Sequence, residues 1–294
     1  MPGDPAAVRV QAGVEVHLGD VTEPASLAAC FAHAPEGRLI VIHCAAVVTL
    51  TAGYNQLVHD VNITGTANII DACLAKDATR LIYVSSTGAI PETPHGTPIT
   101  EPDRFDPDLV VGYYSKSKAA ASQLVLDAVH ERGLDATIVY PTGICGPDDY
   151  AYGPFTRFIL DYCRGGMPAG VEGSFNAVDA RDVADAIVEA CQRGRTGEGY
   201  ILGNQMVSIP ELFGLLSDLT GAQRVTRIVP KWAAGMLGRG GDLVQRLTRR
   251  PQALTSFAVY NLTRNNEFDS TKAQRELDFH PRPFESRCSR PRRR

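Results

Sequence analysis

The stretch RLIVIHCAA, residues 38–46, decides the fold, because it is an apolar, β-branched run without polar alternation. Strands with this pattern are buried on both faces and occur in parallel sheets that helices cover on both sides. RLIYVSS (80–86) and DATIVYP (135–141) repeat the pattern, and the segments about 54–76 and 112–132 have helical periodicity. This alternation predicts an α/β fold, a Rossmann-like doubly wound parallel sheet.

Further elements are expected on both sides of this unit. VEVHL (14–18) is predicted to be a strand and EPASLAACFAHA (23–34) a helix. After residue 150 the alternation is looser. The elements expected there are helices within 152–166, 208–221, 231–249 and 253–278, a strand running into a helix over 176–194, and strands over 199–204 and 225–230.

Composition excludes several function classes. The 294 residues carry a net charge of −4 and 21% charged residues, so no global charge favours nucleic acid or a membrane surface. No apolar run reaches membrane-spanning length, and the start MPGDPAAVRV has no secretory signal. We therefore expect a cytoplasmic protein whose partner is a small molecule, with neither nucleic acid nor membrane.

Cysteine and histidine patterns indicate no metal site. The seven cysteines are widely spread without a CxxC pair, and the seven histidines lack the i, i+4 spacing of a metal-binding helix. Reduced, buried thiols explain most of the cysteines.

Polar motifs follow the predicted strands. Gly19-Asp20, His43 to Ala46, Ser85-Ser86 and Pro141 to Gly143 all lie where a strand ends. Ligands of doubly wound sheets bind at the carboxyl ends of the strands. These motifs therefore mark the candidate site.

The segment YYSKSK (113–118) contains a pair suited to proton transfer. Tyr114 and Lys118 are four apart on a predicted helix, so they share a face. A nearby ammonium lowers a tyrosine pKa from about 10 and makes the phenol a usable general acid or base. Ser86 ends the preceding strand and can hydrogen-bond the same substrate oxygen. Asn62 lies within a predicted helix, where it either holds a water or a bent backbone carbonyl or is a plain surface residue.

Together these segments resemble an extended short-chain dehydrogenase/reductase of the NAD-dependent epimerase/dehydratase superfamily. The pieces that carry the resemblance occur in the family's order and cover most of the chain. They are GDVTE (19–23), VIHCAA (41–46), VNITGTANIIDAC (61–73), RLIYVSS (80–86), YSKSK (114–118), PTGICGP (141–147) and VDARDVADAI (178–187).

The resemblance implies a role for each matched residue. Tyr114 corresponds to the general acid/base, Lys118 to the residue that lowers its pKa and holds the nicotinamide ribose, and Ser86 to the hydroxyl that orients the substrate carbonyl. Thr87 is the alternative to Ser86, and Tyr113 fits less well because its i+4 neighbour is Ser117. Asn62 completes the implied catalytic set. The implied contacts to NAD or NADP are Asp20, Val21, Cys44, Ala45, Ala46, Tyr114, Lys118, Pro141, Thr142, Gly143 and Ile144.

Two motifs narrow the expected chemistry. Ser86-Thr87-Gly88 lacks the carboxylates of the sugar-nucleotide dehydratases, and Ala89-Ile90-Pro91 differs from the Val-Tyr-Gly step of the epimerases. The serine stretch and the loop PTGICGP are most similar to the dihydroflavonol-reductase and 3β-hydroxysteroid-dehydrogenase branch. This branch implies reversible hydride transfer between a nicotinamide and a ketone or secondary alcohol on a small, fairly apolar molecule. The alternatives are a nucleotide-sugar epimerase and a non-catalytic member that senses dinucleotide or binds a partner.

One part of the family pattern has no counterpart in the 294 residues. They contain no strand followed by a GxxGxxG turn, which would hold the pyrophosphate at a helix N-terminus. VEVHLGD already matches the third strand, so the first strand and most of the second, roughly 30 or more residues, are not in the chain. We expect a fragment with impaired dinucleotide binding and an exposed apolar strand edge. Pro2, Gly3 and Asp4 include no arginine for a 2′-phosphate, which favours NAD over NADP.

The resulting domain plan has three parts. Residues 1–150 are the expected dinucleotide-binding domain, truncated at its N-terminus, and 151–283 a mainly substrate-binding lobe with some strands returning to the sheet. Residues 284–294 are expected to be a disordered basic tail. A homodimer is expected to form through the helices over 54–76 and 112–132.

Overall fold

The computed structural model describes residues 13–34, 37–49, 52–150, 152–248 and 254–283. Its α-helices are α1 (Pro24–Ala32), α2 (Gln56–His59), α3 (Gly65–Ala75), α4 (Tyr113–Arg132), α5 (Pro154–Cys163), α6 (Ala180–Arg193), α7 (Ile209–Thr220), α8 (Lys231–Thr248), α9 (Ser256–Thr263) and α10 (Thr271–Leu277). Its strands are β1 (Ile40–His43), β2 (Arg80–Val84), β3 (Ala136–Pro141), β4 (Gly143–Cys145), β5 (Gly170–Val171), β6 (Ser174–Asp179), β7 (Gly199–Leu202), β8 (Met206–Ser208) and β9 (Ile228–Val229).

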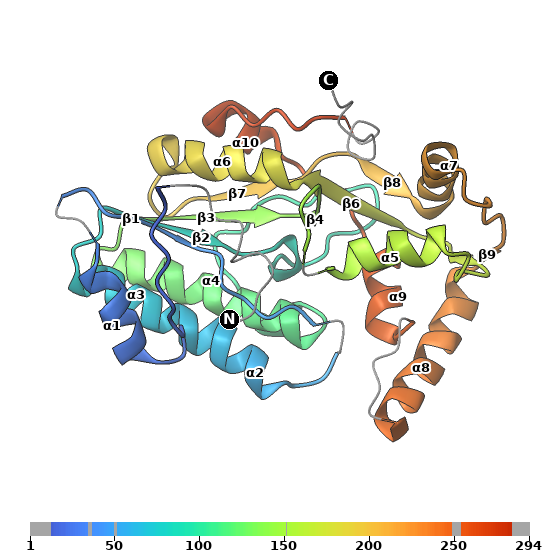
Figure 1. The fold of residues 1–294 in the computed structure, drawn as a ribbon, viewed down its shortest axis with the longest axis horizontal. Coiled ribbons are helices and arrows are strands. Elements are labelled where there is room, and N and C mark those ends of the chain that lie inside the picture. The colour runs from blue at the N-terminus through green and yellow to red at the C-terminus, as the bar shows by residue number, and fades with distance from the viewer. Residues whose placement is uncertain (1–12, 35–36, 50–51, 151, 249–253, 284–294) are drawn as a thin grey trace.

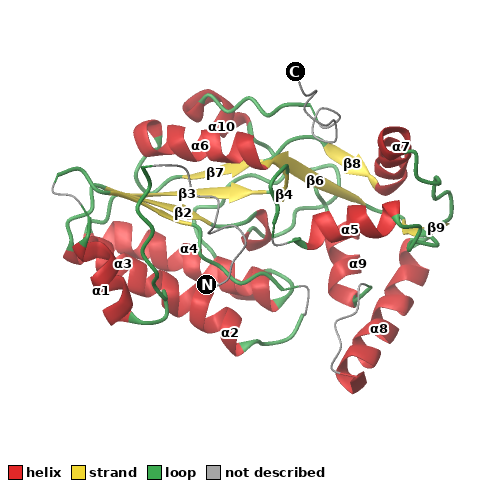
Figure 2. Cartoon of the chain, viewed as in Figure 1, coloured by secondary structure: helices red, strands yellow, loops and turns green. Residues whose placement is uncertain are grey.

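The main sheet is parallel and has the order β1-β2-β3-β7. Helices α1, α3 and α4 cover one face of it, while α6 and α10 cover the other (Figure 1; Figure 2). The predicted doubly wound α/β fold is therefore confirmed, and so are the three strands that suggested it.

Side chains of β2 show why these strands are apolar throughout. Leu81 and Tyr83 belong to the core on the α3 and α4 side, whereas Ile82, between them, belongs to the core under α6. Because successive side chains of a strand point to opposite faces, a strand between two helical layers must be apolar at every position.

The prediction of a strand at 14–18 is wrong. Residues 14–20 form no strand, and Val14, Val16 and Leu18 are exposed. A strand needs a neighbour for its hydrogen bonds, and in the doubly wound order the third strand is separated from the fourth by two others. Within the described residues β1 is the edge of the main sheet, and Ile42 is 44% exposed, which confirms the expected apolar edge.

The helix predicted over 54–76 is continuous but not uniform. A π-helical segment, Asp60–Thr64, joins α2 to α3. Single π turns inside helices are frequent at functional sites, and this one contains Asn62. The surface predicted for a homodimer, α2, α3 and α4, is one layer on the same face of the sheet (Figure 1); the dimer itself stays a prediction.

The second half of the chain divides its elements between two places. β7, α6 and α10 complete the main sheet and its outer layer, as expected for strands that return to it. The remaining elements form a lobe with two smaller sheets, β4-β6-β8 and β5-β9, together with α5, α7, α8 and α9 (Figure 2). The predicted tail 284–294 lies outside the described residues.

Candidate active site

Tyr114 lies in the first turn of α4, beside the end of β2. Its phenol is within hydrogen-bonding reach of Ser86. The hydroxyl of the neighbouring Ser85 instead forms a hydrogen bond with the Ser122 hydroxyl on α4 at 2.8 Å. Ser86, the predicted residue, is thus the serine of this pair that faces Tyr114.

Tyr113 has different surroundings from Tyr114. Its ring packs edge-on against Tyr54, with centroids 4.8 Å apart, and its backbone N–H donates to the carbonyl of Ala52. The two adjacent tyrosines therefore have separate environments, and only Tyr114 contacts the serine stretch in the described residues.

The loop after β3 meets the serine stretch at Thr87. The Thr87 hydroxyl donates to the carbonyl of Pro141 at 3.4 Å, and the backbone N–H of Thr142 donates to Leu202 of β7 at 3.1 Å. Gly143 and Ile144 follow in β4, where Ile144 is 46% exposed. The carboxyl ends of β2, β3 and β7 are thereby joined, as the strand-end motifs predict.

Lys118 is buried below this surface, with 2% of its area exposed. Its ammonium donates to the carbonyl of Val84 at 2.8 Å and to the hydroxyl of Tyr83 at 3.4 Å, and it lies 4.8 Å from the centre of the Tyr83 ring. Desolvation lowers the pKa of Lys118 to about 8, with Cys44 acting in the opposite direction. The side chain therefore remains predominantly cationic at neutral pH.

The expected lowering of the Tyr114 pKa is wrong for this arrangement. Burial raises the pKa of Tyr114, and the hydrogen bond with Ser86 only partly offsets that rise. The physical reason is that the Lys118 ammonium is directed to Val84 and Tyr83, while the phenol is removed from water. Tyr114 is therefore a protonated phenol at neutral pH.

The Asn62 side chain is buried and forms hydrogen bonds with backbone groups, so the alternative of a surface asparagine is wrong. Its carbonyl oxygen accepts from the N–H of Val47 at 2.7 Å, and its amide donates to the Val47 carbonyl at 3.0 Å. The amide also donates to the Ser117 hydroxyl at 3.0 Å, which in turn donates to the carbonyl of Tyr114 at 2.7 Å. Asn62 thus links the loop after β1 to the first turn of α4.

The residues predicted to contact the adenine half of a dinucleotide lie on a separate turn. Asp20 is exposed, and its carboxylate accepts from the N–H and hydroxyl of Thr22, which hold its pKa below the usual value. Val21 is held against α3, because the amide of Asn68 donates to its carbonyl at 2.9 Å and Gly65 leaves room for its side chain. This turn is held on α3 although residues 13–19, the described residues before it, form no strand.

Cys44, Ala45 and Ala46 directly follow β1, at the carboxyl edge of the main sheet. Desolvation raises the pKa of the Cys44 thiol, and the Lys118 ammonium acts to lower it. Cys44 therefore lies within electrostatic reach of Lys118, and the contact of these three residues with a dinucleotide stays a prediction.

Sequence reasoning missed Tyr83, which contacts Lys118 through a hydroxyl and a ring face. His43, part of a predicted strand-end motif, packs on Tyr83 with ring centroids 5.5 Å apart. Burial, and then the charge of Lys118, lowers the pKa of His43 to about 4, so this ring is neutral and adds no second charge. The sequence signal that could have pointed to Tyr83 is that it is a tyrosine in an otherwise mostly aliphatic strand, RLIYV (80–84).

A model of the NAD dependent epimerase/dehydratase family matches residues 3–203. The chain belongs to the NAD-dependent epimerase/dehydratase family. It is therefore an enzyme of the short-chain dehydrogenase/reductase type that uses NAD(P), in agreement with the expectation from its motifs.

Individual relatives in the family agree with the expected branch. The chain is 31% identical to the sterol demethylase protein B of Methylococcus capsulatus, over 91% of this chain and 80% of that protein. It is 30% identical to a putative dihydroflavonol 4-reductase of Synechocystis, over 80% and 69% of the two chains. The crystal structure of gox2253 superposes with a TM-score of 0.83 at 29% identity, covering 98% of this chain and 86% of the other.

The described residues fit one end of the family's dinucleotide. Ala45 and Ala46 are small residues directly after β1, and Tyr114 lies one helical turn before Lys118, whose buried ammonium bonds to Val84 and Tyr83. For the pyrophosphate, the described residues contain no glycine-rich turn between a strand and a helix. They therefore match the nicotinamide-ribose end of NAD(P) and contain no cradle for its phosphates.

Proposed function

We propose that the chain transfers hydride between NAD(P) and a ketone or secondary alcohol on a small, fairly apolar molecule. The observation that carries the proposal is the pairing of Tyr114 with Ser86 beside the buried cation of Lys118. The names of these two relatives support the substrate class, because sterols and dihydroflavonols are both fused-ring compounds that carry a ring hydroxyl or ketone.

When bound, the nicotinamide supplies or accepts the hydride. In the reducing direction Tyr114 donates its phenolic proton to the substrate oxygen, and the Ser86 hydroxyl hydrogen-bonds the same oxygen. Because burial keeps the phenol protonated at neutral pH, Tyr114 is ready to act as the acid in ketone reduction. The oxidising direction requires loss of that proton and is therefore favoured at higher pH.

Asn62 and Lys118 act on the geometry and the charge of this site. Asn62, with Ser117, holds the turn that carries Tyr114 against the loop after β1. Lys118 places one positive charge at the end of β2, and the neighbouring His43 ring is neutral and adds no second charge.

A substrate assay tests the proposal. A steroid ketone, a dihydroflavonol and UDP-glucose are each incubated with the protein and with NADH, NADPH or NAD at about 1 mM, a concentration that allows for weak dinucleotide binding. We expect ketone-dependent oxidation of the reduced cofactor and no change in the sugar nucleotide. Epimerisation of UDP-glucose without ketone reduction would contradict the proposal, and cofactor binding without any turnover would favour the non-catalytic alternative.

A further inference from the structure

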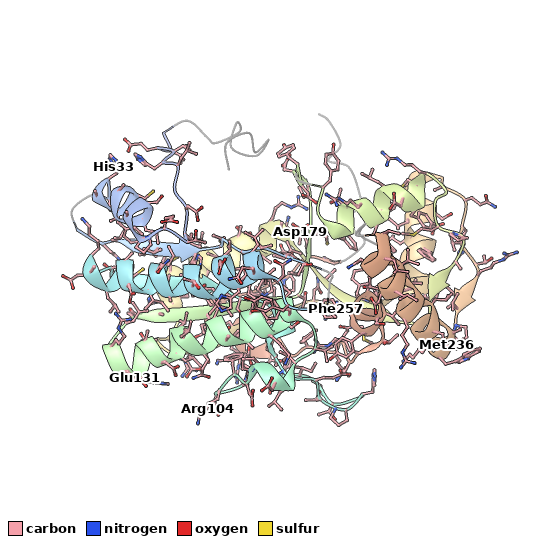
Figure 3. The ribbon with its side chains drawn as sticks, turned by 90° about the horizontal axis from the view of Figure 1, so that it is seen from below. His33, Arg104, Glu131, Asp179, Met236 and Phe257 are labelled. Carbon is pink, nitrogen blue, oxygen red and sulfur yellow. The ribbon has the colours of Figure 1, made fainter. Side chains whose placement is uncertain are left out.

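The helix α8 has an unusual distribution of side chains. Its large apolar residues are exposed: Trp232 by 71%, Met236 by 63%, Leu237 by 54%, Leu243 by 57%, Val244 by 44% and Leu247 by 77%. Met236 lies at the outer rim of the C-terminal lobe, away from the main sheet (Figure 3). A water-soluble helix normally turns such residues toward the core.

The buried face of α8 consists of small residues. Ala234 is fully buried, and Gly238 and Gly241 lie against the backbone of 254–256, where an added Cβ would meet backbone atoms at 3.1 Å or closer. This close approach fixes α8 on the chain leading into α9. The helix is therefore held in place by its small residues, and its large apolar face is left outward.

The outward residues form one face. Trp232, Met236, Leu243 and Leu247 are separated by four, seven and four residues, which places them on one side of an α-helix, with Leu237 and Val244 beside them. We refer to these six residues as the α8 apolar face. Contiguous exposed apolar surface of this kind marks an interaction site rather than ordinary surface.

The charge around the α8 apolar face indicates an anionic partner. The sequence of α8 itself, residues 231–248, contains three basic residues, Lys231, Arg239 and Arg246, and one acidic residue, Asp242. Its net charge is therefore +2, whereas the whole chain carries −4. A second copy seated on the same face through a twofold axis would set one basic group against the other, which like-charge repulsion disfavours.

We propose that α8 attaches the protein to the surface of an anionic lipid bilayer. Trp232 and the aliphatic residues of the α8 apolar face enter the boundary between headgroups and acyl chains, while the basic residues contact the anionic headgroups. No helix within the described residues is long and apolar enough to cross a membrane, and a helix lying in the interface does not need to be.

The position of α8 gives this attachment a consequence for the active site. Its neighbour α9 carries Phe257, which contacts Gly112 at the start of α4, two residues before Tyr114. A bilayer at α8 therefore lies next to the part of the C-terminal lobe that packs on the start of α4, the helix that carries Tyr114. The attachment itself does not rest on the proposed function.

Trp232 is the only tryptophan of the chain, so its fluorescence reports on this face directly. Vesicles of phosphatidylglycerol and phosphatidylcholine are expected to shift its emission to shorter wavelength, and brominated acyl chains are expected to quench it. Raising the salt concentration from about 0.05 to about 0.5 M should weaken vesicle binding, because surface charges are then screened.

Paired variants separate the α8 apolar face from exposed apolar residues in general. The double variant Met236→Ser, Leu247→Ser is expected to bind anionic vesicles at least about tenfold more weakly, since two apolar side chains no longer enter the bilayer. Val188→Ser, Leu219→Ser changes two residues that are 54% and 41% exposed on α6 and α7 and should bind as the unaltered protein does. Unchanged circular dichroism confirms that each variant folds.

Three results would overturn the proposal. The first is a Trp232 emission spectrum that vesicles do not change, and the second is an equal weakening of vesicle binding by both double variants. The third is an emission shift without lipid that grows with protein concentration, which would assign the α8 apolar face to a second copy of the chain.

Discussion

At the scale of single residues, the site is a set of buried polar groups that hold one another in place. Tyr114 and Asn62 were recognisable because the segments YSKSK and VNITGT resemble family motifs, whereas position alone left Asn62 open between two alternatives. The partners of Lys118 were not recognisable, since Tyr83 lies 35 residues away and meets Lys118 only when β2 packs against α4. The same tertiary contact explains why the pKa of Tyr114 was predicted in the wrong direction.

Asn62→Ala tests the structural part of this network. The change removes three hydrogen bonds, two to Val47 and one to Ser117, and leaves buried groups unpaired, so we expect unfolding free energy to fall by about 2–4 kcal/mol. Asn68→Ala on the same continuous helix removes one hydrogen bond, to Val21, and should cost about 1 kcal/mol. Urea denaturation of both variants measures the difference, and equal losses would show that Asn62 does not hold the loop.

At the scale of elements, the hydrophobic pattern predicted a strand or helix correctly where the structure describes the elements that pack against it. β1, β2 and β3 lie where the apolar runs predicted them, and α7 lies within the predicted range 208–221 and begins with a reciprocal cap between Ser208 and Glu211. The segment 14–18 has the composition of a strand but no strand beside it to pair with. The π-helical turn at Asp60–Thr64 was also not predicted, because the spacing of its apolar residues is compatible with an ordinary α-helix.

The junction of α4 with the C-terminal lobe can be tested at Gly112. This residue has φ of 87°, and a Cβ there would lie 2.2 Å from the ring of Phe257 (Figure 3). Since Phe257 is 3% exposed, its ring has little space in which to move. Gly112→Ala is therefore expected to lower unfolding free energy by about 3 kcal/mol, through backbone strain and overpacking together.

Gly96→Ala is the matched control. Gly96 has a similar φ of 84° but no atom within 4 Å of an added Cβ, so only the backbone cost of about 1 kcal/mol applies. Chemical denaturation of the two variants separates the free-energy cost of backbone strain, which both share, from the cost of the contact with Phe257, which only Gly112→Ala has. A loss at Gly112 no larger than at Gly96 would mean that α4 and α9 are not tightly joined.

At the scale of the whole molecule, the described residues bring the candidate catalytic groups together at one edge of the main sheet. Four parallel strands and two helical layers bring the serine stretch, the start of α4 and the loop after β3 together. On the other side of β1 the described sheet ends, and Ile42 is exposed. Family membership and the order of the strands were predictable from the motifs, whereas the outward apolar face of α8 was not, because hydropathy along the chain does not tell which face of a helix is buried.

The central claim is that Tyr114 is the proton donor of a carbonyl reductase. Its most direct test compares the rate of ketone reduction, with reduced nicotinamide at about 1 mM, in Tyr114→Phe and in Tyr113→Phe. Each variant removes one hydroxyl from adjacent positions of α4, but only Tyr114 faces Ser86. Tyr114→Phe should lower the rate by about 10²–10⁴-fold while Tyr113→Phe stays within a few-fold of the unaltered protein. Retained activity in Tyr114→Phe, or an equal loss in Tyr113→Phe, would contradict the account.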